Sequence, residues 1–107
     1  MDQLSLEQRS QELQAKFEEI LGSRNVYYNP PASVKMNYPA IVFSRSRTEK
    51  KNANNAAYIL SHRYEVTVID RDPDCKYIET ILRLPMCTHD RHFVSDNLHH
   101  NTFTLYY

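Results

Sequence analysis

Histidine and cysteine, the side chains best suited to binding a transition metal, gather near the carboxyl end of this 107-residue chain. They are Cys87, His89, His92, His99 and His100. Structural zinc sites take four thiolate or imidazole ligands at characteristic spacings, and the spacing here matches no zinc motif. The cluster therefore predicts surface and loop histidines, with a small metal- or nucleic-acid-binding protein as the alternative that uses it.

The same cluster contains the residue types of a cysteine nucleophile with a histidine base. Such a pair needs a third, orienting group and a site that stabilises an oxyanion. Asp90 and Asp96 lie nearby in the sequence, but any loop supplies an aspartate. The single glycine, Gly22, also excludes a glycine-rich phosphate loop and a nucleophile elbow. We therefore expect no enzyme, no catalytic residue, no bound metal and no cofactor.

Three carboxylates alternate at Asp70, Asp72 and Asp74. A divalent-cation loop would need further oxygen ligands and a glycine for its bend, and the sequence has neither here. We interpret the stretch as a helix start, with Asp72 as the N-cap, Pro73 at the first helical position and Asp74 in the first turn. The prediction is a helix over residues 73–84 that Pro85 ends.

A basic stretch at residues 45–51 carries a net charge of +3, from four basic side chains against Glu49. The basic residues are Arg45, Arg47, Lys50 and Lys51. They suit contact with phosphates, but no aromatic residues are interleaved for base stacking. The stretch therefore fits a solvated loop, a protein contact or a passing contact with nucleic acid. Residues 44–57 are polar without glycine or proline, and we predict that they form a long projecting loop between two antiparallel strands.

The spacing of apolar residues predicts the helices and strands that position these side chains. Residues 58–69 alternate with period two, which predicts a central strand with its more apolar face on the even positions. Residues 102–107 alternate again and predict a C-terminal strand. Ser5 and Gln8 form a capping box and Gly22 follows the last apolar position, so a helix is expected over 6–21. Shorter strands are expected at 25–28, 38–44 and around Phe93.

Together these elements predict a single α+β domain over residues 1–107, with a mixed, mainly antiparallel sheet of four to five strands and two helices. The net charge is 0 and the hydrophobic content 41%, so nothing global indicates nucleic acid or a membrane surface. No apolar run approaches a membrane span, and no secretory signal follows Met1. Two cysteines fit reduced thiols in a cytosolic product. The eight tyrosines fit either half-buried sheet positions or a protein interface.

Several stretches together resemble the small tail completion proteins of long-tailed bacteriophages, usually called tail terminators. They are Asn25-Val26-Tyr27-Tyr28-Asn29-Pro30-Pro31, Met36-Asn37-Tyr38-Pro39-Ala40-Ile41-Val42-Phe43, Tyr64-Glu65-Val66-Thr67-Val68-Ile69-Asp70 with Asp72-Pro73-Asp74, Leu84-Pro85-Met86-Cys87, and Asp96-Asn97-Leu98-His99-His100. The resemblance covers most of residues 25–107. It is a pattern of structural residues without a catalytic signature, and other neck proteins, such as head–tail connectors and minor tail proteins, remain the alternative.

The resemblance implies a virion protein of the tail and neck, assembled in the host cytoplasm as a ring of six subunits. Such a ring caps the tail tube, stops its polymerisation and offers a surface to the head–tail connector protein. Its partners would be further copies of itself, the tail tube protein and the connector, with no membrane. DNA would pass through the lumen without sequence-specific binding. By resemblance, the loop at 44–57 faces the tube or the lumen, which places Arg45, Arg47, Lys50 and Lys51 there.

Charge is distributed in a way that is compatible with a ring. Residues 1–22 carry a net charge of −3, from five acidic against two basic side chains, whereas residues 45–51 carry +3. Opposite patches on one neutral chain suit head-to-tail contacts, which close into rings when the rotation allows. This assigns Glu12, Glu18 and Glu19 of the first helix to a subunit interface.

Overall fold

The fold is α+β, with two helices and a five-stranded mixed sheet in the order β1-β2-β3-β5-β4. The computed structural model describes the backbone of residues 5–53 and 56–107, and the side chains of 5–48 and 62–107. The elements are α1 (Leu6–Leu21), β1 (Val26–Tyr28), β2 (Ala40–Ala53), β3 (Ala56–Asp70), α2 (Tyr77–Leu82), β4 (Cys87–Ser95) and β5 (Leu98–Tyr106). β1 pairs with β2 in parallel, and the other pairings are antiparallel. The predicted fold class is confirmed.

Helix α1 begins and ends where the sequence predicts. The Ser5 side chain accepts from the Gln8 backbone amide at 3.1 Å, and the Gln8 side chain accepts from the Ser5 amide at 2.9 Å. At the other end, Gly22 has a left-handed backbone (φ 75°) and its amide donates to the Glu18 carbonyl. A residue with a Cβ is strained in this conformation, so the glycine fixes the end of the helix.

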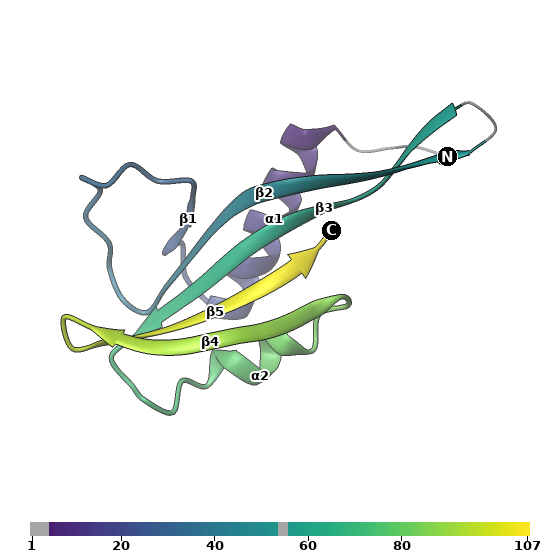
Figure 1. Cartoon of the computed structure of the whole chain (residues 1–107). Helices are drawn as coiled ribbons and strands as arrows, with labels where there is room; N and C mark the ends of the chain where they lie inside the picture. Colours follow the sequence, from purple (N-terminus) through teal and green to yellow (C-terminus); the bar gives the residue numbers. More distant parts are fainter. Residues whose placement is uncertain (1–4, 54–55) are drawn as a thin grey trace.

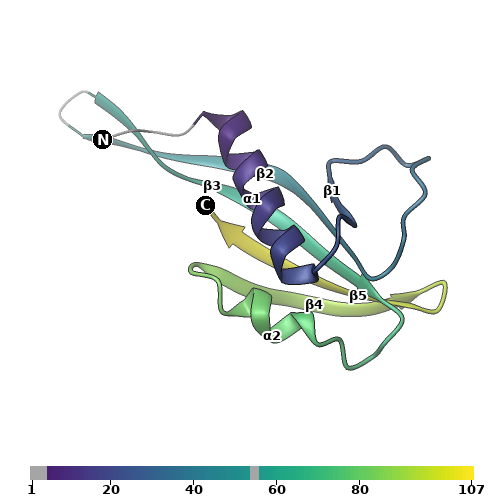
Figure 2. The ribbon, with the colours of Figure 1, turned by 180° about the vertical axis from the view of Figure 1, so that it is seen from behind.

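Both helices cover the same face of the sheet (Figures 1 and 2), and the core lies between. On β3 the even residues from His62 to Val68 are buried, as the alternation predicts. Phe17 of α1 meets Phe43 of β2 edge to face, with ring centroids 5.2 Å apart. The largest fully buried side chains are Tyr64, Phe17, Phe43, Phe103, Leu13, Ile41, Ile81, Leu105, Val66 and Val68. No helix of the described residues lies over the opposite face.

The predicted loop at 44–57 is wrong. β2 continues from Ala40 to Ala53 and pairs with β3 as far as the Ala53–Ala56 pair, so the stretch is a long β-hairpin. Two register shifts, between Arg45 and Arg47 and between Glu49 and Lys50, interrupt the ladder. Such bulges place extra residues in one strand and obscure a period of two. The backbone ladder holds these polar residues in strands although their sequence lacks an apolar face.

The predicted helix over 73–84 is also wrong at both ends, because α2 spans only Tyr77–Leu82. Its N-cap is Lys76, without a side-chain cap, and Asp72 caps nothing. Instead Asp70 Oδ1 accepts from the Asp72 amide at 3.2 Å, and Asp72 Oδ1 accepts from the Asp74 amide at 2.9 Å. These local side-chain to backbone bonds compete with the helix and hold a turn. The last two strands are longer than expected, at Cys87–Ser95 and Leu98–Tyr106.

Candidate functional site

The most prominent feature of the molecule is a two-stranded extension of the sheet, which we call the hairpin arm (residues 46–53 and 56–62). β1 pairs with β2 only at Ile41–Phe43, and β5 pairs with β3 only at Arg63–Asp70. Beyond these pairs β2 and β3 pair only with each other among the described strands, and the hydrogen bond from the Tyr107 amide to the His62 carbonyl marks the base of the arm. The arm projects from the body in Figure 1 and accounts for the elongated shape, which measures 52 × 24 × 22 Å.

The predicted basic residues are divided between the arm and its base. Arg47 lies on the arm and is exposed. Lys50 and Lys51 follow it on β2, but the structure describes only their backbone. Arg45 lies at the base, where it lines a groove beside α1. Arg45 thus lies beside the helix of its own chain, at the base of the arm and not along it.

The base of the arm contains a buried histidine. His62 is 3% exposed, and its Nδ1 lies 2.8 Å from Thr48 Oγ1 on the paired strand. Burial lowers the pKa of His62 below its usual 6.5, and the positive charges of Arg9 and Arg45 lower that pKa further. The neutral imidazole is thus the form that this site favours, and it joins the two strands where the arm leaves the body.

A groove of about 300 Å³ runs along the side of α1 that faces β1 and β2; we call it the α1 groove. Its lining comes from three elements and comprises Leu6, Glu7, Ser10, Gln11, Gln14, Tyr28 and Arg45. Leu6 is 43% exposed and Tyr28 is 37% exposed, although both are large apolar side chains. The groove thus combines two exposed apolar groups with one acidic and one basic side chain.

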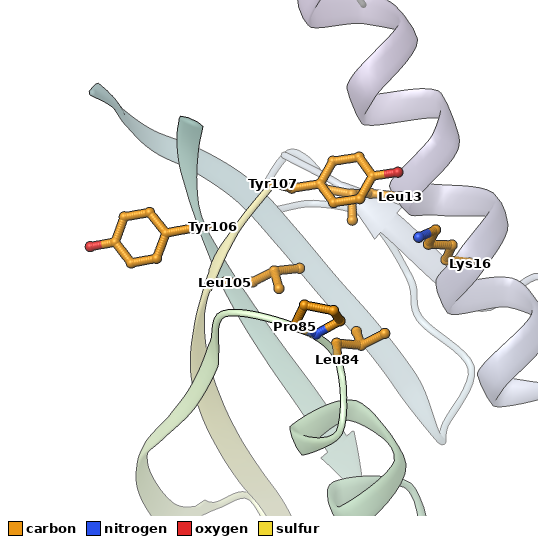
Figure 3. Close-up of a pocket in the computed structure, with 7 residues that line it drawn as sticks. All are labelled: Leu13, Lys16, Leu84, Pro85, Leu105, Tyr106 and Tyr107. Carbon is orange, nitrogen blue, oxygen red and sulfur yellow. The ribbon is translucent and has the colours of Figure 1, made fainter. Parts of the chain in front are cut away.

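A second, smaller pocket of about 140 Å³ lies on the other side of α1 (Figure 3). It is lined by Leu13, Lys16, Leu84, Pro85, Leu105, Tyr106 and Tyr107. In the figure Lys16 extends towards the Tyr107 ring, and Nζ lies 5.0 Å from the ring centroid. Carbon dominates this lining and no pair of acid and base groups converges there, so the pocket suits packing rather than catalysis.

The chain closes over α1 at Tyr107. Arg9 Nη1 donates to the Tyr107 backbone oxygen at 2.8 Å, and the Tyr107 hydroxyl donates to Glu12. Burial, followed by the nearby Glu12 carboxylate, raises the pKa of Tyr107 to about 12. Of the three predicted interface glutamates, Glu12 is therefore engaged within its own chain, whereas Glu18 is half-buried and Glu19 exposed.

The histidines lie on β4 and β5 but form separate pairs. His92 Nε2 and His99 Nδ1 are 3.0 Å apart, with ring planes within 7° and centroids 5.2 Å apart. Because the centroids are much farther apart than these nitrogens, the rings meet edge to edge, at hydrogen-bond distance. His89 contacts Asn101 at 3.1 Å, and His100 stacks on Phe93 at 4.7 Å.

These pairings give each histidine of the cluster a partner within the sheet. Among residues 5–53 and 56–107, no three His, Cys, Asp or Glu side chains are placed to hold a metal ion together. Cys75 and Cys87 are free thiols, and burial raises the pKa of each, so neither is poised as a nucleophile. The carboxylates of Asp70 and Asp72 accept backbone amides in the turn described above, and Asp74 contributes its amide there.

One exposed apolar residue was not singled out by the sequence. Met86 is 70% exposed, the highest value among the exposed large hydrophobic side chains that the structure describes. It has a left-handed backbone (φ 59°), and its carbonyl accepts from the Tyr106 amide at 3.1 Å. Leu82 on α2 is 42% exposed. Methionine before a strand is ordinary in a sequence, and only the turn that follows α2 shows that this one points outward.

Comparison with known proteins gives no relative: no protein-family model matches this chain, and no curated protein matches it. In the described part of the chain, no helix is long and apolar enough to cross a membrane.

Proposed function

We propose that this protein is a tail terminator, a structural virion protein that forms a ring on the phage tail tube and joins the tube to the head–tail connector. The observation that carries the proposal is the hairpin arm, which extends from the body where the resemblance expects a tube- or lumen-facing hairpin. The protein acts by binding, without catalysis and without a cofactor.

The physical support for this proposal is that the arm has little to stabilise it in an isolated subunit. A two-stranded hairpin gains little stability from itself, and sheets normally need a third strand or a packed helix. Among the described elements, the β1–β2 pairing ends at Phe43 and the β3–β5 pairing ends at Arg63, so the arm has no third strand along its length. Its β2 strand carries Arg47, Lys50 and Lys51, and in a lumen these cations would attract passing DNA through its phosphates without reading its sequence.

The first test is the mass of the purified protein. A ring of six 12.7-kDa chains has a mass of about 76 kDa, which light scattering separates from a monomer. A protein that stays a monomer alone and on tail tubes would contradict the proposal. Zinc content, measured on the same sample, separates the structural protein from the metal-binding alternative.

The second test is the position of the protein in the virion. Phage that lacks this gene should produce tubes of uncontrolled length that fail to join heads, and the purified protein should restore joining. Cryo-electron microscopy of the completed neck should then show one ring between tube and connector. Density at another level of the neck would instead assign the chain to a different neck protein.

A further inference from the structure

We infer that neighbouring copies of this chain bind head to tail, with Met86 of one copy inserted into the α1 groove of the next. The inference rests on the proposed ring and deepens it, because it names the two surfaces that close the ring.

The inserting surface, which we call the Met86 knob, is made of Glu79, Leu82, Arg83 and Met86. Residues 79, 82 and 83 are spaced to share one side of α2, and all four side chains are exposed. The hydrogen bond from the Tyr106 amide to the Met86 carbonyl ties this turn to the edge of β5. Methionine is unbranched and adaptable, which suits a side chain that fills an irregular groove.

The receiving surface is the α1 groove, with a volume of about 300 Å³. Leu6 and Tyr28 give it an apolar floor, and both remain more than a third exposed in the single chain. Exposed large apolar side chains that gather at one hollow indicate an interaction site. A thioether chain is long and thin enough to enter between them.

The two surfaces lie at opposite edges of the molecule. Tyr28 belongs to β1 and Met86 directly precedes β4, and these are the two edge strands of the sheet order β1-β2-β3-β5-β4. Figure 1 shows β1 and β4 at opposite edges of the sheet. A contact between different surfaces of identical chains is heterologous, and it closes into a ring when the rotation between copies allows.

Charge favours a second copy as the occupant. The knob carries one acidic and one basic side chain, Glu79 and Arg83, on either side of Leu82. The groove also carries one of each sign, Glu7 and Arg45. Docking that pairs Arg83 with Glu7 and Glu79 with Arg45 leaves no like charges facing each other, and such complementarity fixes the register of an interface.

The first experiment removes the apolar anchor. We expect Met86→Asp to weaken self-association of the full chain by about thirtyfold in sedimentation velocity, because a carboxylate would have to enter an apolar site. The matched control is Val94→Asp, since Val94 is 55% exposed and lies outside the knob. It should assemble like the wild type. Circular dichroism checks that both variants are folded.

The second experiment exchanges the charges. Glu7→Arg and Arg83→Glu should each weaken self-association by about tenfold, and the double variant should recover most of it because the pair is restored in the opposite sense. Equal weakening in the double variant and the singles, or no effect of Met86→Asp, would overturn the inference. So would a wild-type chain that does not self-associate at any concentration.

The outcomes separate this inference from the proposed function. A chain that self-associates through the knob and groove but fails to cap tails supports the interface and contradicts the tail terminator. A chain that caps tails as a ring, with a mass unaffected by Met86→Asp, keeps the function and removes the interface. If Met86→Asp abolishes only binding to tubes, the Met86 knob contacts the tube protein and the second copy is excluded.

Discussion

At the scale of single residues, the base of the hairpin arm contains a buried polar side chain, His62. It is 3% exposed, bonded to Thr48 and close to the positive charges of Arg9 and Arg45. Burial and both arginines disfavour the imidazolium. The base of the arm is therefore built around a neutral histidine.

This arrangement predicts a pH-dependent stability. The folded pKa of His62 is below 6.5, the value expected of the unfolded chain, so the unfolded state binds the proton first as the pH falls. The contribution of neutral His62 to the free energy of unfolding is complete above pH 6.5. It is lost as the pH falls from 6.5 through the lower pKa of the folded state. The measurement is the free energy of unfolding across this range for the wild type and for His62→Gln.

The other four histidines are present in both proteins, so the difference between the two curves isolates His62. We expect that difference to shrink as the pH falls. A difference that does not change with pH would show that His62 is protonated to the same extent in the folded and unfolded chains.

At the scale of elements, the sequence predicts an N-cap at both Ser5 and Asp72, but the structure has a side-chain cap only at Ser5. Ser5 caps α1 through a reciprocal pair of bonds with Gln8. Asp72 instead accepts from the Asp74 amide within an exposed turn, and α2 begins later, at Tyr77.

Alanine substitution should separate these two roles. Ser5→Ala should cost about 1 kcal/mol because α1 loses its N-cap, whereas Asp72→Ala should cost about 0.5 kcal/mol or less because only an exposed turn bond is lost. Urea denaturation of both variants provides the comparison. Equal losses would mean that the turn at Asp72 supports α2 after all.

The hairpin arm should be less stable than the strands that it continues. β3 pairs with both β2 and β5 from Arg63 to Ile69, whereas over 56–61 β2 is its only partner among the described strands. At the boundary, the His62 carbonyl still accepts from the Tyr107 amide at 2.9 Å. Opening the two-stranded part breaks fewer contacts. Amide hydrogen exchange of the monomer should therefore show lower protection in residues 56–61 than in 63–69. Uniform protection along β3 would contradict this view. Slower amide exchange in the arm after assembly would support its role as a binding element.

At the scale of the whole molecule, the body and the arm have different tasks in the proposed ring. The knob and the α1 groove lie on the body, at its two edges. The arm projects from the body (Figure 2), so in the proposed ring we assign closure to the body and contact with the tube or DNA to the arm. Variants can therefore affect one and spare the other.

Reversal of the arm charges tests this separation. Arg47→Glu, Lys50→Glu and Lys51→Glu, combined in one chain, should leave the mass of the ring unchanged but reduce its activity in tail joining. The effect should decrease with added salt, since exposed charges are screened over about 8 Å at physiological ionic strength. Mass by light scattering and joining of heads to tails in vitro are the two measurements.

The matched control reverses three exposed basic residues outside the arm, Arg24, Lys35 and Arg71, and changes the net charge by the same amount. It should join tails normally. If both triple variants fail equally, total charge rather than the arm is responsible.

Elements whose signals are local can be predicted from the amino-acid sequence alone. The bounds of α1 follow from Ser5, Gln8 and Gly22, since a cap involves residues within one turn. The apolar alternation of β3 and β5 identified the buried faces, because a sheet with one covered face requires a period of two. These signals were sufficient for the α+β class.

Features that depend on partners distant in the sequence become visible only in the folded chain. Residues 44–53 are polar and interrupted by bulges, and they become a strand because β3 offers a complete backbone ladder. The α1 groove combines residues of α1, β1 and β2, and the exposure of Met86 depends on where the short α2 ends. Surfaces of this kind arise from packing between elements, which no local pattern specifies.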